Sequence, residues 1–129
     1  MKIASIVARY LLGLMFTVFG LNGFFHFIPQ PPPANPLALQ FLIAVGTSHF
    51  ALFFFAVQVV AGVLLLSGFF VPLALILLAA ELYNILAFHM TLAPGAAPGV
   101  IACVLWVLVF VQYRASFQGV LSAKPAVQS

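Results

Sequence analysis

The chain has 129 residues, of which 66% are hydrophobic and only 4% are charged. Because a water-soluble domain carries roughly 25% charged residues, this composition excludes a water-soluble protein and indicates one that is embedded in a membrane. The formal net charge of +3 comes from four basic side chains and one acidic side chain. So few charges do not indicate a nucleic-acid-binding protein.

The first predicted membrane span covers residues 3–27, which can cross about 30 Å of hydrocarbon with some tilt. Lys2 resembles the basic start of a signal peptide, but Arg9 interrupts the segment and no small-residue cleavage site follows. We therefore expect this span to be retained. One of its faces carries small side chains that would let a neighbouring helix approach closely, namely Gly13, Thr17 and Gly20.

A proline-rich segment, residues 29–36, follows the first span and cannot be helical, because proline removes a backbone donor and clashes with the preceding turn. We expect an extended, polyproline-type loop. Since the segment contains no charged side chain, we also expect it to lie against the membrane surface or a partner protein.

Residues 37–45 are predicted to form a short helix that ends at Gly46, where the chain breaks. Thr47 or Ser48 would then cap the second span, residues 48–67. The alternative is one continuous helix from the start of the short segment to Ser67, which would be too long for a bilayer without strong tilt.

The second and third spans are joined by a very short connection. Gly68 is predicted to end the second span, and Pro72 opens the third, residues 72–90, at a first-turn position. So short a link makes the two spans antiparallel neighbours. A turn rich in proline and glycine leads to the fourth span, residues 98–117, and residues 121–129 form a tail that we expect to be loosely ordered.

The basic side chains lie only at the two ends of the chain, at Lys2, Arg9, Arg114 and Lys124. By the positive-inside rule both termini are cytoplasmic, which requires an even number of spans. The sequence therefore predicts an all-α fold over residues 1–120: a four-transmembrane-helix bundle with cytoplasmic termini and a short outer interfacial helix before the second span.

Glu81 is the only acidic residue of the chain, and it lies inside the third span. A charged group at the bilayer centre costs roughly 2.5–3.5 kcal/mol even on mild insertion scales, so such residues usually face partners and often mark function. A rise of about 1.5 Å per residue puts Gln58 at the same depth. Asn84 lies one turn along from Glu81, and Arg9 is the one base that could approach it. We predict a polar mid-membrane cluster of these four residues.

Two interpretations of this cluster stay open. Glu81 could handle protons or a ligand, or it could hold the helices in register, either as a neutral hydrogen-bonded acid or as an ion pair with Arg9. We assign no catalytic residue.

The histidines form a second layer, because His26, His49 and His89 each lie near the predicted outer end of a span. Imidazole is a ligand for copper, zinc and haem, so these residues are candidate ligands. No two of them have ligand spacing on one helix, and no cysteine or carboxylate accompanies them, so interfacial hydrogen bonding is the alternative and we assign no metal. The single cysteine, Cys103, excludes a disulfide within the chain.

Fifteen phenylalanines would cover lipid or line an apolar groove. A quinone, a haem or a pigment could contact such a surface, and we assign none of these cofactors.

Three segments, taken in order and spacing, resemble the DoxX-like family of small bacterial membrane proteins. They are Arg9-x-x-x-Gly13-Leu14-x-Phe16-x-x-x-Gly20, the run from Gln58 to Gly68, and the run from Asn84 to His89. The resemblance extends over nearly the whole chain and implies a four-helix bundle in the bacterial inner membrane. The founding members are small subunits of a thiosulfate:quinone oxidoreductase. Where the family usually has a glutamate in the second span, this chain has Gln58, which puts any activity that needs that glutamate in doubt.

The resemblance implies an accessory or structural subunit of a larger membrane electron-transfer complex, in contact with lipid and other membrane subunits rather than nucleic acid. One alternative is an autonomous carrier or binder of a quinone or another lipid-like molecule, built around the layer of Gln58 and Glu81. The other is a small membrane oxidoreductase with a histidine-ligated cofactor. Enzymatic activity is not the leading expectation.

Overall fold

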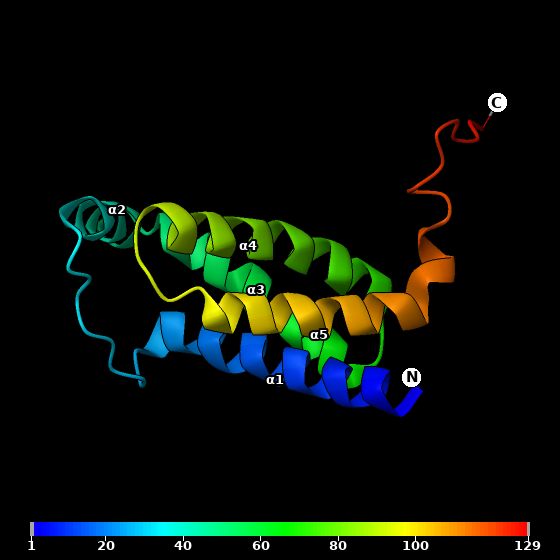
Figure 1. The fold of residues 1–129 in the computed structure, drawn as a ribbon, viewed down its shortest axis with the longest axis horizontal. Coiled ribbons are helices and arrows are strands. Elements are labelled where there is room, and N and C mark those ends of the chain that lie inside the picture. Colours follow the sequence, from blue (N-terminus) through cyan, green and yellow to red (C-terminus); the bar gives the residue numbers. More distant parts are fainter. Residues whose placement is uncertain (1, 129) are drawn as a thin grey trace.

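The structure is a computed structural model that describes residues 2–128. Every regular element in this range is helical (Figure 1): α1 (Lys2–Phe25), α2 (Pro36–Thr47), α3 (Phe50–Ser67), α4 (Val71–Thr91), α5 (Ala97–Tyr113) and the 3₁₀ helix η1 (Arg114–Phe117). Four segments are long and apolar enough to cross a membrane: α1, α3, α4, and α5 together with η1. The prediction of an all-α chain with four membrane spans is confirmed.

The four long helices lie side by side and alternate in direction (Figure 1). α1 packs against α3 and α5, and α4 packs against the same two helices. α2 contacts α3 at the end of the molecule that is remote from both termini. We call the end that carries the termini and the α3–α4 turn the terminal end, and the opposite end, which carries α2, the loop end.

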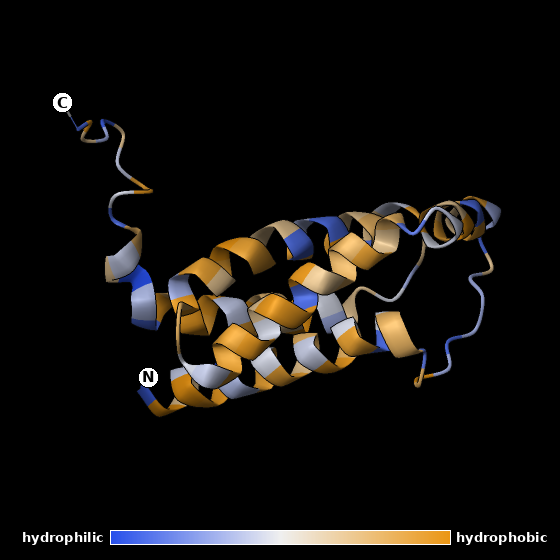
Figure 2. Ribbon diagram, turned by 180° about the vertical axis from the view of Figure 1, so that it is seen from behind, coloured by the Kyte–Doolittle hydropathy of each residue, from blue (hydrophilic) through white to orange (hydrophobic). Residues whose placement is uncertain are grey.

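The surface of the four long helices is apolar. Figure 2 shows them mostly in the hydrophobic colour, with only scattered hydrophilic turns. Large apolar side chains are exposed on each of them, for example Leu14, Phe53, Ile76 and Val104. Such a surface belongs in contact with lipid, which agrees with a multi-pass membrane protein.

The turn between α3 and α4 follows the sequence prediction. Gly68 adopts a left-handed conformation with φ +80°, and its N–H donates to the carbonyl of Leu64. This is the usual conformation of a glycine that ends a helix. Pro72 lies in the first turn of α4, where its missing N–H leaves no helical hydrogen bond unmade.

The break before α3 is not where the sequence predicted it. α2 continues through Gly46 to Thr47, and the chain turns at His49, which has a φ of 64°. The hydroxyl of Ser48 accepts a hydrogen bond from the N–H of Phe50 at 3.3 Å, so Ser48 stabilises the turn. A helix tolerates an internal glycine at a cost of about 1 kcal/mol, which explains why Gly46 alone does not end α2. The alternative of one continuous helix is wrong.

In the half of the molecule next to the terminal end, which we call the terminal half, the helices are held together by side-chain packing and by hydrogen bonds. Its core consists of fully buried apolar side chains, including Leu12, Leu65, Val71, Leu75, Leu78 and Val109. Ser5 donates to the carbonyl of Leu108, and Trp106 donates to that of Leu75, each at 2.8 Å. These bonds link α1 to α5 and α5 to α4.

The small-residue face of α1 packs against α3, as the sequence analysis interpreted it. A Cβ atom added to Gly62 of α3 would lie 2.6 Å from the backbone nitrogen of Thr17 and 2.9 Å from the carbonyl oxygen of Gly13. The two backbones are therefore in direct contact, which only glycine permits at this point.

Candidate functional site

Gln58 of α3 and Glu81 of α4 face each other in the interior. Their exposed fractions are 4% and 5%. The Nε2 of Gln58 donates to the Oε2 of Glu81 at 3.5 Å, which is the long limit for a hydrogen bond. The two adjacent spans are thus joined by a polar pair at mid-helix, where the depth of each residue along its span predicted one.

Arg9 does not take part in this pair. Its guanidinium donates to the carbonyl of Leu65 near the end of α3, and it lies over the ring of Tyr10 at 4.5 Å from the centroid. Arg9 therefore supports the α1–α3 contact at the terminal end, and Gln58 is the hydrogen-bond partner of Glu81 in the structure.

Asn84 is also separate from the pair. Its side chain is exposed, and its Nδ2 donates to the carbonyl of Ala80, one turn back on α4, at 2.9 Å. Of the four residues predicted to form the cluster, the structure joins Gln58 with Glu81 and places Arg9 and Asn84 elsewhere.

The three histidines occupy different surroundings. His26 and His49 are exposed and have positive φ values of 54° and 64°, so each marks a turn between elements. His89 is half-buried in the last turns of α4. Within residues 2–128, no three histidine, cysteine or acidic side chains gather as metal ligands would.

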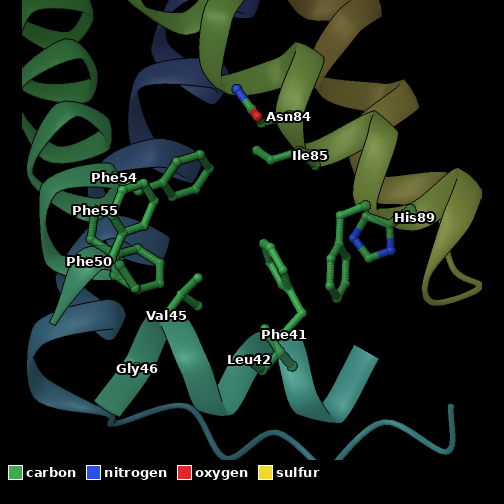
Figure 3. A pocket seen from close by; sticks show the side chains of 12 residues that line it. Phe41, Leu42, Val45, Gly46, Phe50, Phe54, Phe55, Asn84, Ile85 and His89 are labelled. Atoms are coloured by element: carbon green, nitrogen blue, oxygen red, sulfur yellow. The ribbon is translucent and has the colours of Figure 1, made fainter. Parts of the chain in front are cut away.

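A cavity of about 370 Å³ lies between α2, α3 and α4 at the loop end (Figure 3). We call it the lateral cavity. Apolar side chains from all three helices dominate its lining, and its polar side chains are Asn84 and His89 of α4. The full lining is Phe41, Leu42, Val45, Gly46, Phe50, Ala51, Phe54, Phe55, Asn84, Ile85, Phe88 and His89.

α2 forms one wall of the lateral cavity, and Asn35 ties it to α4. The side-chain oxygen of Asn35 accepts from the N–H of Leu37 and so caps α2, while its Nδ2 donates to the carbonyl of Leu92 at 2.7 Å. The second bond ties the start of α2 to the end of α4. Further along α2, the ring of Phe41 packs against that of Phe88, with centroids 5.7 Å apart.

A second cavity, of about 310 Å³, lies between the four long helices and is also lined by exposed residues at the loop end, Gln30, Gly95 and Pro98. We call it the inner cavity. α1, α3, α4 and α5 all contribute to its walls. Three polar side chains line it: Gln58 of the buried pair, His89, and Gln30 from the loop between α1 and α2. Sequence reasoning missed Gln30, because nothing in a proline-rich loop indicates which side chain turns back over the helices.

His89 has the least satisfied side chain of the two cavities. Its Nδ1 is buried and has no hydrogen-bond partner in the described part of the chain. Its ring packs edge-on against Phe88, with centroids 5.3 Å apart. Because Nδ1 has no accessible surface, it does not itself face a cavity, and His89 lines both cavities with the rest of its ring.

The site thus consists of two neighbouring cavities towards the loop end, and Gln58, the partner of Glu81, lines the inner one. Sequence reasoning found Gln58, Glu81, Asn84 and His89 but not the cavities, since α2 and α3 are adjacent in the chain while the third wall comes from α4. No protein-family model, no curated protein and no solved structure matches this chain.

Proposed function

We propose that this membrane protein binds an apolar, lipid-like small molecule in the lateral cavity. The observation that carries the proposal is the lining of that cavity: twelve residues, five of them phenylalanines, around about 370 Å³. Ligand pockets typically measure about 300–1,000 Å³ and are apolar with a few placed polar groups, here Asn84 and His89.

The position of the cavity supports a ligand that arrives from the bilayer. Two of its lining residues on different helices, Phe41 of α2 and Phe50 of α3, are 46% and 67% exposed. A molecule dissolved in lipid can therefore reach the cavity without crossing the closed terminal half.

The orientation in the membrane is part of this proposal. The basic residues lie at the ends of the chain, and both ends leave the molecule at its terminal end (Figure 1). The positive-inside rule then puts the terminal end in the cytoplasm and the two cavities in the outer half of a bacterial inner membrane.

Extraction of the purified protein tests the binding function. The protein is isolated in mild detergent, and its bound small molecules are quantified by mass spectrometry. Ala51→Phe would fill the lateral cavity, and Ala56→Phe adds the same ring on the same helix at an exposed position outside the lining. We expect a near-stoichiometric lipid-like molecule in the wild type and in Ala56→Phe, and its loss in Ala51→Phe. Equal amounts in all three proteins would contradict the proposal.

The DoxX-like segments favour a second function, an accessory subunit of a membrane electron-transfer complex. The same purification distinguishes the two functions. An accessory subunit is isolated with stoichiometric protein partners and keeps them in Ala51→Phe, whereas an autonomous binder is isolated with its ligand alone.

A further inference from the structure

We propose that the ligand is a neutral lipid with a hydroxyl or carbonyl oxygen in its head group, and that this head group binds in the inner cavity between His89 and Gln58. The inference rests on the proposed function and adds to it the chemistry of the head group and the residues that select it.

The first step is that the two cavities adjoin. Ile85 and His89 of α4 line both of them. Figure 3 shows these two side chains at the α4 wall of the lateral cavity. Ile85 and His89 therefore stand between the two cavities. They are the side chains that would have to move for a ligand with its tail among the phenylalanines to place its head group in the inner cavity.

The second step is that two polar side chains that line the inner cavity, His89 and Gln58, have unused hydrogen-bonding capacity. His89 lines the inner cavity, and its side chain makes no hydrogen bond to another residue in the described part of the chain. Gln58 makes one side-chain hydrogen bond, from Nε2 to Glu81, whereas a glutamine amide has two N–H donors and an acceptor oxygen. A neutral imidazole supplies one donor and one acceptor, so a hydroxyl or carbonyl oxygen finds a partner on either residue.

The third step is that the head group has to be uncharged. Neither lining contains a lysine, arginine, aspartate or glutamate. The one ionisable side chain in the two linings is His89, and the carboxyl group of Glu81 lies next to the inner cavity, bonded to Gln58. An anionic head group would meet no lysine or arginine there and would approach the carboxyl group of Glu81, which is unfavourable. We therefore expect fatty acids and phospholipids to bind less tightly than neutral lipids.

Two kinds of lipid share the remaining chemistry: long-chain quinones, and long-chain alcohols. Three probes with the same tail length separate them, namely a decyl-substituted benzoquinone, 1-decanol and decanoate at pH 8. Binding to the protein in nanodiscs is measured against protein-free nanodiscs, which corrects for partition into lipid.

We expect the quinone, the alcohol or both to bind at least about tenfold more tightly than decanoate, a ratio that corresponds to about the free energy of one hydrogen bond. Tight binding of the quinone alone would mean that the protein recognises its ring. Similar affinities for the quinone and the alcohol would mean that a single oxygen atom is enough for recognition. Decanoate that binds as tightly as the neutral probes would overturn the inference while leaving the lateral cavity as a lipid site. Absence of binding by all three would overturn the proposed function as well.

Variants of His89 test the assigned residue. His89→Leu keeps apolar volume but removes both nitrogens, and we expect it to weaken binding of the neutral probe about tenfold. His89→Gln restores a hydrogen-bonding side chain and should recover most of the affinity. His49→Asn is the control, because His49 lies outside both linings and asparagine tolerates its positive φ. Wild-type affinity in His89→Leu would show that His89 does not select the head group. Gln58 is not replaced because its loss would also disturb Glu81.

Discussion

At the scale of single residues, the buried Gln58–Glu81 pair shows why an acid can be retained in an otherwise apolar span. Its partner is a neutral amide on the neighbouring helix, while Arg9 donates its hydrogen bond at the terminal end. A pair of this kind satisfies a polar group in an apolar interior and fixes the rotation of α3 relative to α4. Gln58 also lines the inner cavity, so the residue that pairs with Glu81 is part of the wall of that cavity.

Two substitutions of Glu81 show whether its hydrogen bond or only its size contributes to the stability of the protein. Glu81→Gln keeps a hydrogen-bonding side chain of the same length and should change thermal stability little. Glu81→Leu leaves the amide of Gln58 buried without this partner, which should cost roughly 1–3 kcal/mol. Thermal unfolding in detergent, followed by the fluorescence of the single tryptophan, Trp106, measures the stability of both variants.

Two further variants sharpen this test. Glu81→Leu combined with Gln58→Leu makes the contact fully apolar and should recover part of the lost stability, since neither group is then buried unpaired. Asn84→Leu, at an exposed position on the same helix, should have little effect. The role assigned to the pair is wrong if Glu81→Leu alone unfolds at the wild-type temperature.

At the scale of the elements, α1 and α3 approach each other more closely than any other two helices that meet at a glycine. Gly13 and Gly62 allow the backbones to touch, and further along the chain Gly20 lies against Val59 and Gln58. This contact positions α3, and therefore Gln58, relative to α1. The inner cavity depends on it, because Gln58 of α3 and residues of α1 both line that cavity.

Substitution at Gly62 tests this contact. In Gly62→Ala the added methyl meets backbone atoms of α1, which cannot rotate away as a side chain can, so α1 and α3 have to separate. We expect a loss of roughly 1–3 kcal/mol, as for other overpacked cores. Gly46→Ala is the matched control, because an added Cβ on α2 meets no atom within 4 Å. It should be neutral or gain up to about 1 kcal/mol of helix propensity. Equal unfolding temperatures for the two variants would contradict the backbone contact.

At the scale of the whole molecule, the two halves differ in what their polar groups do. In the terminal half, Ser5, Arg9 and Trp106 bond to carbonyl oxygens of neighbouring helices, so side chains close the structure. In the loop half, the two cavities lie between the helices, and the buried Nδ1 of His89 has no partner among residues 2–128. The cavities are therefore confined to one end of the four-helix unit, and the inter-helix side-chain bonds of Ser5, Arg9 and Trp106 to the other.

Cysteine labelling tests whether the loop end lies on the periplasmic side of the membrane and the terminal end on the cytoplasmic side. Single cysteines at the exposed positions Ala34, Pro94 and Ser122 are introduced into a Cys103→Ala background. A membrane-impermeant maleimide added to intact cells should label the first two from the periplasm and Ser122→Cys only after the inner membrane is permeabilised. The reverse pattern would place the cavities in the cytoplasmic half of the bilayer.

The sequence by itself determined the spans and their connections. Charge and hydropathy are properties of each segment, and a bilayer sets the length that a segment needs, so the four spans could be placed within a few residues of the observed helices. Gly68 and Pro72 likewise marked their turn through local backbone preferences. The pairing of Gln58 with Glu81 followed from helical rise and the short α3–α4 link.

Only the tertiary structure decided which faces of the helices meet. In a membrane helix nearly every position is apolar, so no periodicity distinguishes the buried face from the lipid-facing one. The hydrogen bonds that set the faces join residues far apart in sequence, such as Asn35 with Leu92 and Ser5 with Leu108. For this reason the sequence identified His89 as a candidate but could not show that it stands between two cavities. The wall that α2 adds depends on a side-chain contact to the end of α4, across 57 positions of the chain.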